Sequence, residues 1–197
     1  MTDEARAAGP IAEAESLVSR GLLAEAIATV QRAIGEAESP DLHVALATLY
    51  MRRGGMAEAQ RALDRALALD PRHAVAHAYV GGMRLDAGDA HGAQQRLDIA
   101  RDLAPDDLIV LMKRAEYWLR LGIFANARAE LTHGLRDGGG APHVRAMAET
   151  MLSAIEQRSR NSFSRQLITL PDLSGFRRMF RRSGHPAATP VEAEVSR

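Results

Sequence analysis

The chain contains three successive stretches with one pattern, HVALATLYMRRGGMAEAQRALDRALALDP (43–71), HAYVGGMRLDAGDAHGAQQRLDIARDLAP (77–105) and LMKRAEYWLRLGIFANARAELTHGLRDGG (111–139). A glycine follows the first half of each stretch, and these glycines, at positions 54, 88 and 122, are evenly spaced. The same interval relates the other shared positions: Ala59, Ala93 and Ala127; Leu63, Leu97 and Leu131. Self-similarity at the constant spacing that separates Gly54, Gly88 and Gly122 indicates a repeat protein whose units stack on their neighbours.

Each unit is predicted to be two helices joined by a turn. Leucines recur at steps of three and four residues, which places them on one helix face. The glycines supply the left-handed backbone conformation of a helix end, and Pro71 and Pro105 stop the second helix of their units. A copy at Gly21 precedes these three. The pattern therefore predicts eight helices, at about 10–20, 23–36, 41–53, 56–69, 73–87, 90–103, 107–121 and 123–136.

The three stretches resemble tetratricopeptide repeats over roughly residues 7–139. The family's L-G-x-x-Y positions are occupied by Leu46-Ala47 with Tyr50, Val80-Gly81 with Arg84, and Arg114-Ala115 with Trp118. Its A-x-x-x-F positions are occupied by Ala59 with Leu63, Ala93 with Leu97, and Ala127 with Leu131. The resemblance implies an all-α fold, a right-handed α-solenoid of about four helix-turn-helix units, used as a non-catalytic protein–protein interaction scaffold.

The chain divides into four segments by sequence. Residues 1–9 are expected to be a disordered N-terminus, and residues 10–141 the repeat array. The glycines at 138–140 break the array, and Pro142 suits the first turn of a further helix. Residues 142–160 are therefore expected to form a capping helix for the open end of the solenoid. Residues 161–197 lose the helical period and are expected to be a flexible, arginine-rich tail.

Composition excludes several classes of function. There are no cysteines, so disulfides, thiolate catalysis and zinc–thiolate sites are excluded. Net charge is zero, so no global field attracts nucleic acid. The N-terminus has no apolar signal region, and the longest apolar run, 108–112, is far too short to span a membrane, so a cytoplasmic location is expected. Lys113 is the only lysine, which favours a GC-rich, bacterial coding sequence.

No catalytic or cofactor motif is present: the chain has no P-loop, G-x-S-x-G, G-x-G-x-x-G, H-E-x-x-H or EF-hand pattern. We interpret the carboxylates as side chains on solvent-exposed helix faces. His73 and His77 have metal-ligand spacing, but no third ligand is near in sequence, and His43 and His77 occupy packing positions of the repeat. The sequence therefore predicts no enzyme activity, no cofactor and no metal.

The first helix of each unit carries a second apolar stripe beyond what its own packing needs. In tetratricopeptide proteins these helices line the concave surface, so we interpret the stripe as a groove for an apolar peptide or helix; the alternative is that it packs against adjacent helices. One subclass of tetratricopeptide proteins uses lysine, arginine and asparagine at these positions to clamp the carboxylate tail of heat-shock chaperones. These residue types are mostly absent from the stripe. The predicted groove residues are Val44, Thr48, Met51, Val75, Tyr79, Leu85, Ile109, Met112, Glu116 and Leu119.

The tail carries the most ligand-like segments of the chain. Residues 167–171 read LITLP, and Phe176, Met179 and Phe180 fall at i, i+3 and i+4 with arginines between them. Such a segment could dock on a protein groove, contact an anionic membrane or remain free. We expect contact through these three side chains, with a partner or with the chain's own groove, and no nucleic-acid binding.

Two functions remain open on the sequence alone. The first is an adaptor that holds an apolar peptide or helix in the concave groove. The second is a secretion- or assembly-type chaperone that keeps a client protein soluble, which would release its client where an adaptor would keep it.

Overall fold

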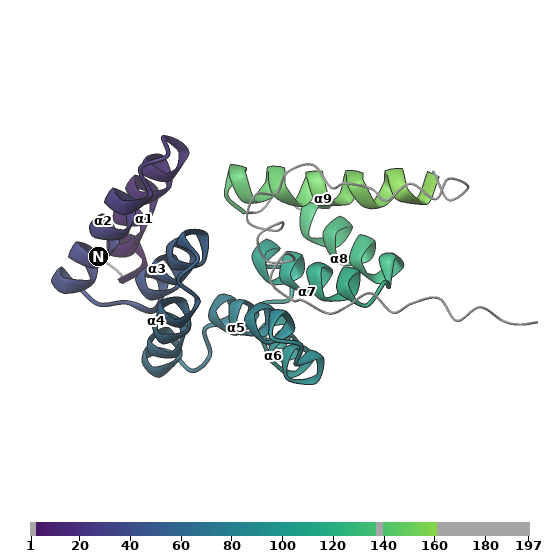
Figure 1. The fold of residues 1–197 in the computed structure, drawn as a ribbon, viewed down its shortest axis with the longest axis horizontal. Helices are drawn as coiled ribbons and strands as arrows, with labels where there is room; N and C mark the ends of the chain where they lie inside the picture. The colour runs from purple at the N-terminus through teal and green to yellow at the C-terminus, as the bar shows by residue number, and fades with distance from the viewer. Residues whose placement is uncertain (1–2, 137–139, 161–197) are drawn as a thin grey trace, which may run out of the picture.

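The computed structural model describes residues 3–136 and 140–160, which form nine α-helices and no strand (Figure 1). The helices are α1 (Asp3–Ser19), α2 (Leu23–Glu36), α3 (Pro40–Arg53), α4 (Met56–Leu69), α5 (Ala74–Asp86), α6 (Ala90–Leu103), α7 (Leu108–Arg120), α8 (Phe124–Arg136) and α9 (Pro142–Arg160). Within these ranges no helix is both long and apolar enough to cross a membrane.

The helix ends are set by local signals in the sequence. Asp89 and Asp107 cap α6 and α7, because their carboxylates accept the backbone N–H of Gly92 at 2.8 Å and of Val110 at 2.9 Å. Four glycines that follow the first helix of each pair adopt the predicted left-handed conformation, with φ values of 81°, 89°, 84° and 76° at Gly21, Gly54, Gly88 and Gly122. The predicted helix-turn-helix units are thus confirmed.

The N-terminus differs from the prediction. The segment 1–9 was expected to be disordered with a first helix from about residue 10, but α1 begins at Asp3. Pro10 lies inside the helix and does not begin it. Ala7 and Ala14 are buried in the first hydrophobic cluster. This tertiary packing stabilises the extra turns that the local signal did not predict.

The helices pack as antiparallel pairs that follow an arc (Figure 1). The helices α3, α5 and α7 lie on its inner side and α2, α4 and α6 on its outer side. One core cluster runs from α1 to α5, a second joins α5, α6 and α7, and a third joins α7, α8 and α9. No pair of helices has a core of its own, which is the solenoid principle.

Small residues sit where the helices of a pair cross. The alanines that recur once per repeat, Ala59, Ala93 and Ala127, are fully buried, and so are the leucines one turn later. A Cβ at Gly81 would lie 2.8 Å from Cγ of Leu97, so α5 and α6 approach too closely for a side chain there. This close crossing holds α5 against α6.

At the C-terminal end, α9 packs against α7 and α8. Ala148, Met151 and Ile155 of α9 join the cluster that contains Leu108 and Leu131. The other side of α9 is exposed, as at Met147. The helix thus covers the last repeat with one face, as expected of a cap. The predicted tail, with Phe176, Met179 and Phe180, lies outside the described residues.

Candidate functional site

The inner side of the arc, formed by α3, α5 and α7, is the candidate binding surface (Figure 1). The structure divides the ten predicted groove residues into two sets. Val44, Leu85 and Met112 are buried in the three core clusters, with 8%, 8% and 5% of their surface exposed. These three residues pack between helices and do not present a surface to a ligand. The other seven are half-buried: Thr48, Met51, Val75, Tyr79, Ile109, Glu116 and Leu119.

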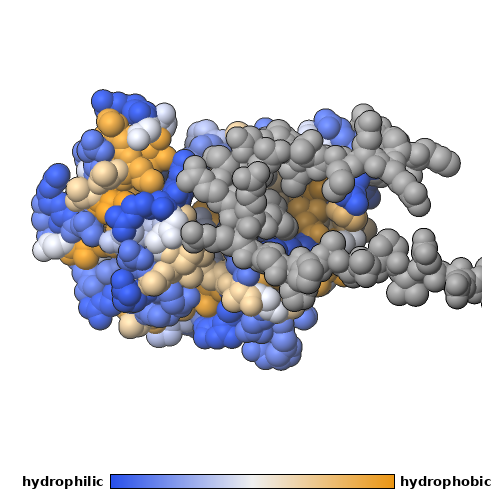
Figure 2. Space-filling model, in the orientation of Figure 1, coloured by the Kyte–Doolittle hydropathy of each residue, from blue (hydrophilic) through white to orange (hydrophobic). Residues whose placement is uncertain are grey.

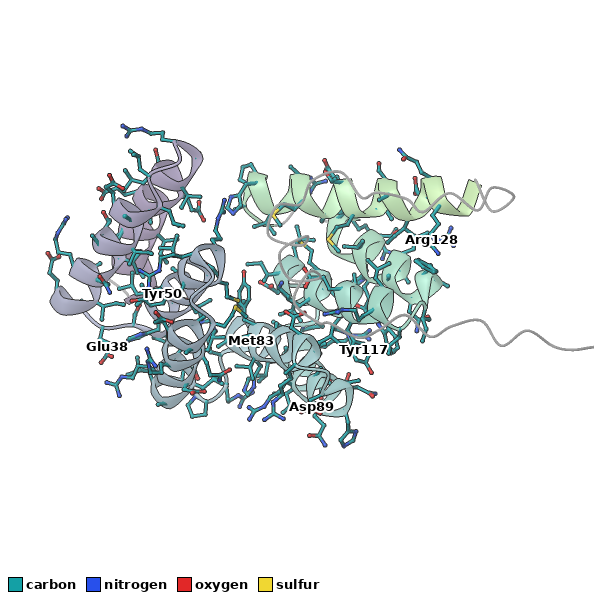
Figure 3. The ribbon with its side chains drawn as sticks, viewed as in Figure 1. Glu38, Tyr50, Met83, Asp89, Tyr117 and Arg128 are labelled. Atoms are coloured by element: carbon teal, nitrogen blue, oxygen red, sulfur yellow. The ribbon has the colours of Figure 1, made fainter. Side chains whose placement is uncertain are left out.

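Sequence reasoning missed one apolar residue of this surface. Met83 is half-buried, one helical turn after Tyr79, and Figure 3 places it on the inner side between α3 and α7. The spacing of four residues from Tyr79 was the signal that could have found it. We use the term inner face for the seven half-buried groove residues together with Met83.

The repeat spacing also brings charged residues to the inner face. Val75, Tyr79 and Asp86 lie on one side of α5, at steps of four and seven residues, and the equivalent positions on α7 are Ile109, Lys113 and Arg120. The surface therefore combines the predicted apolar stripe with charges, of which Asp86 was not predicted from the sequence.

These charged side chains join α5 to α7. The Lys113 ammonium donates to both carboxylate oxygens of Glu116, at 3.1 and 2.9 Å, and lies 5.1 Å from the centre of the Tyr79 ring. Arg120 pairs with Asp86 across the two helices. All four charged side chains are largely shielded from water, with 12% to 24% exposed. Partly desolvated pairs of this kind favour one geometry of a surface rather than adding much stability.

Burial dominates the electrostatics of this charged group. It raises the pKa of Tyr79, and it raises the pKa of Asp86 in spite of the attraction of Arg120. Burial is the largest single influence on Lys113 and would lower its pKa, but the charges of Glu116, Tyr79 and Asp86 and the hydrogen bond to Glu116 together outweigh it, so the pKa lies above its ordinary value. Oδ2 of Asp86 is buried and has no hydrogen-bond partner among the described residues. One buried carboxylate oxygen beside the inner face is thus left without a donor among the described residues.

The histidines considered as metal ligands have structural roles. His73 caps α5, since its Nδ1 accepts from the Ala76 N–H, and its Nε2 lies 2.9 Å from Asp41 of α3. His77 is buried between the carbonyl of Pro71 and the guanidinium of Arg96. Across residues 3–136 and 140–160, no three His, Asp or Glu side chains are grouped to hold a metal ion.

One polar cluster away from the inner face corrects the interpretation that all carboxylates are solvated. Arg114 and Glu130 are both buried, and Nε of Arg114 donates to Oε1 of Glu130 at 3.0 Å. Arg114 also donates to Asp98 at 2.6 Å. Arg114 stands at a position where the repeat pattern has an apolar residue. That departure was the signal in the sequence for a buried polar cluster. The cluster ties α6, α7 and α8 together and is structural.

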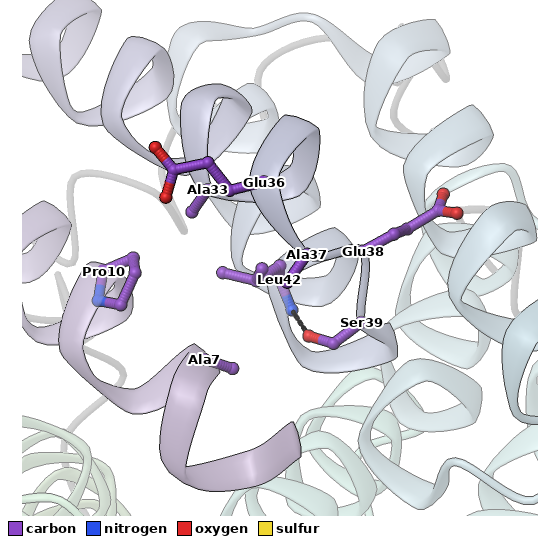
Figure 4. Close-up of a pocket in the computed structure, with 8 residues that line it drawn as sticks. All are labelled: Ala7, Pro10, Ala33, Glu36, Ala37, Glu38, Ser39 and Leu42. Carbon is purple, nitrogen blue, oxygen red and sulfur yellow. Dashed lines mark hydrogen bonds between the residues drawn. The ribbon is translucent and has the colours of Figure 1, made fainter. Parts of the chain in front are cut away.

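A hollow of about 410 Å³ lies at the other end of the array, between α1 and the α2–α3 connection (Figure 4). Hydrophobic residues gather on the nearby surface over α1 and α2 (Figure 2). The carboxylate of Glu38, at the rim, is held by Arg65, which donates from Nε at 2.7 Å and from Nη2 at 2.6 Å, and by His43 at 2.8 Å. Those contacts lower the pKa of Glu38 to about 2, and the hydrogen bonding of Arg65 makes the largest contribution. The lining residues are Ala7, Pro10, Ala33, Glu36, Ala37, Glu38, Ser39 and Leu42.

Comparison with known proteins identifies the fold. No curated protein matches the chain. The structure is similar to that of PilF from Pseudomonas aeruginosa, with 22% identity over 81% of this chain and 72% of the other and a TM-score of 0.56. It is also similar to a tetratricopeptide repeat protein of Thermus thermophilus, with 18% identity over 88% of this chain and 96% of the other and a TM-score of 0.59.

A family model described as tetratricopeptide repeat matches residues 44–90 and 84–142, which together cover half of the chain. The match begins in α3 and ends at the start of α9, so it includes the whole of the α5–α7 surface. The constant repeat spacing, the paired helices and this match lead to one conclusion: the chain belongs to the tetratricopeptide repeat family.

Proposed function

We propose that the chain is an adaptor whose inner face binds one amphipathic helix or apolar peptide of a partner protein. The tetratricopeptide fold is that of a protein–protein interaction scaffold. The proposal rests on the combination of half-buried Met51, Tyr79 and Met83 with the Asp86 carboxylate, whose Oδ2 has no partner in the described part of the chain.

The chemistry of this surface favours a ligand with two kinds of side chain. Apolar anchors would cover the methionines and the Tyr79 ring, and each fully buried anchor contributes about 1.5–3 kcal/mol. A donor on the ligand, from an arginine or lysine, would satisfy Oδ2 of Asp86. Ordering the ligand offsets part of that gain, so we expect micromolar rather than nanomolar binding.

The test is capture of partners from the native cell on the immobilised chain, compared between variants. Tyr79→Glu and Met51→Glu should each abolish capture of the partner, because they place a charge on the apolar part of the inner face. Ile99→Glu is the matched control: Ile99 is an exposed apolar residue on the outer helix α6, so this variant should capture normally. Met112→Glu is not informative, since Met112 is buried and its replacement would unfold the last repeat.

A peptide from the captured protein then gives the affinity by fluorescence polarisation. Equal binding by the wild-type chain, Tyr79→Glu and Met51→Glu, all folded by circular dichroism, would contradict the proposal. The lifetime of the complex separates the two functions that the sequence leaves open. A complex that persists indicates an adaptor, and a client that is released on folding indicates a chaperone.

A further inference from the structure

The last described helix ends near the edge of the inner face where the charged side chains lie. The last helix, α9, ends at Arg160, and the guanidinium of Arg158 lies 4.5 Å from the centre of the Phe124 ring at the start of α8. Phe124 follows directly on the turn that ends α7 at Arg120. The end of α9 is therefore close to the end of α7 that carries the Arg120–Asp86 pair.

The length of chain beyond α9 is sufficient to return to the inner face. Fifteen residues lie between Arg160 and Phe176. A flexible chain of that length has an average end-to-end distance of about 20–25 Å. The helix α7 has 13 residues, which is about 20 Å at 1.5 Å per residue. Residues 176–182 can thus reach any part of the α7 surface without being stretched.

The apolar side chains of this tail segment match the apolar part of the inner face, and its arginines could donate to one carboxylate oxygen there, although the four charged side chains of the surface cancel. Phe176, Met179 and Phe180 supply the apolar anchors, and the segment carries arginines at 177, 178, 181 and 182 with no acidic residue. The inner face supplies Met51, Tyr79 and Met83 at the margin of the first core cluster. An arginine of the segment would donate to Oδ2 of Asp86, the buried acceptor that no described residue uses.

We propose that residues 176–182 dock on the inner face of the same chain and cover the surface assigned above to a partner. This inference rests on the location of the proposed binding surface but not on the identity of any partner. A tether of this length gives an effective concentration in the millimolar range, so an interaction that would be weak between separate molecules is populated within one chain. A partner would have to displace the segment. Its apparent dissociation constant would be the intrinsic value divided by the fraction of chains whose inner face is uncovered.

The chain is well suited to a direct measurement of this contact. It contains one tryptophan, Trp118 on α7, and no cysteine. Ser174→Cys therefore gives a single labelling site next to the segment, and energy transfer from Trp118 to a dansyl-type label at that position reports the distance between tail and α7. The full-length chain is used throughout, at nanomolar to micromolar concentration.

Two sets of changes should each reduce the transfer efficiency by at least half. The first is the tail variant Phe176→Ser/Met179→Ser/Phe180→Ser, which removes the anchors. The second is Tyr79→Glu, which changes the inner face. The matched controls are Val191→Ser/Val195→Ser, further along the tail, and Ile99→Ser on the outer side, and both should leave the transfer unchanged.

Transfer that is the same in the tail variant, Tyr79→Glu and the controls would overturn the proposal. So would transfer that rises with protein concentration and is lost on dilution with unlabelled chain, since the segment would then occupy a second copy. If partner capture depends on Tyr79 while the transfer responds to neither set of changes, the proposed function stands and this inference fails. If the inference holds, the tail variant should bind a captured partner's peptide about two- to tenfold more tightly than the wild-type chain.

Discussion

Arg114 and Glu130 form a buried ion pair across α7 and α8, with Nε of Arg114 donating to Oε1 of Glu130 at 3.0 Å. Each side chain is less than a tenth exposed. Arg114 also donates to the Leu97 carbonyl at 3.4 Å and to Asp98 at 2.6 Å, so one guanidinium joins three successive helices. The pair replaces an apolar contact at a core position of the repeat and therefore fixes the docking of α8 on α6 and α7.

Glu130→Ala should destabilise the protein by about 3 kcal/mol, because it leaves the Arg114 guanidinium buried without its one buried carboxylate partner. Arg101→Ala is the control: Arg101 lies 3.5 Å from the same carboxylate but is half exposed, so its loss should cost less than about 1 kcal/mol. The double variant Arg114→Met/Glu130→Met should be closer to wild type than Glu130→Ala. Chemical denaturation measures all three, and equal losses in Glu130→Ala and Arg101→Ala would contradict a buried pair.

Gly81→Ala and Gly82→Ala should differ in sign although they are neighbours in α5. A Cβ at Gly81 would lie 2.8 Å from Cγ of Leu97 and 3.2 Å from the Ala93 carbonyl, so the α5–α6 crossing must open. A Cβ at Gly82 would meet only Cδ of Lys113 at 3.7 Å, an ordinary contact. We expect Gly82→Ala to gain up to about 1 kcal/mol from helix propensity and Gly81→Ala to lose about 1–3 kcal/mol. Thermal melts that rank Gly81→Ala as the more stable variant would refute the close crossing.

Gly88→Ala and Gly35→Ala separate backbone strain from packing. Neither site has an atom within 4 Å of a Cβ, but Gly88 has a φ of +84° whereas Gly35 lies within α2. Alanine at 88 must adopt a left-handed backbone, which costs about 1 kcal/mol. Alanine at 35 improves helix propensity by about the same amount. Equilibrium unfolding of both variants checks this, and a loss of stability in Gly35→Ala would mean that the helical glycine has another role.

The carboxyl of Glu38 should titrate near pH 2 instead of its ordinary 4.5, chiefly because Arg65 donates two hydrogen bonds to it and secondarily because of His43. The folded-state pKa lies below the unfolded value, so the stability from this group is complete above about pH 4.5 and is lost as the pH falls towards 2. A carbon-detected NMR titration of the Glu38 carboxyl gives the value directly.

The matched variants for that titration are on α4. Arg65→Gln should return the pKa of Glu38 towards 4.5. Arg61→Gln, one turn earlier on the same helix and not in contact with Glu38 in the structure, should leave the titration as it is in the wild type. A wild-type value near 4.5 would show that the Arg65 contact does not persist in solution.

The helices from α2 to α8 and the turns between them could be predicted because their signals are local. Glycine at a left-handed turn, aspartate at an N-cap and leucines at three- and four-residue steps act within one or two helical turns. The start of α1 could not be predicted in this way. Ala7 is buried in a cluster that includes residues of α2 and α3, which are distant in sequence, so the helical turns before residue 10 depend on contacts that no local signal indicates.

For the binding surface, the sequence determined which residues share a helix face, and only the tertiary structure decided how deeply each one lies. Periodicity placed Val44 and Met51, or Met112 and Glu116, on one side of a helix, but the distance and tilt of the next helix buried Val44 and Met112 more deeply than Met51 and Glu116. The same stacking brought Asp86 and Arg120 together from equivalent positions of successive repeats. Helix period is a property of the local backbone, whereas burial and ion pairing depend on helices that the chain brings together only when it folds.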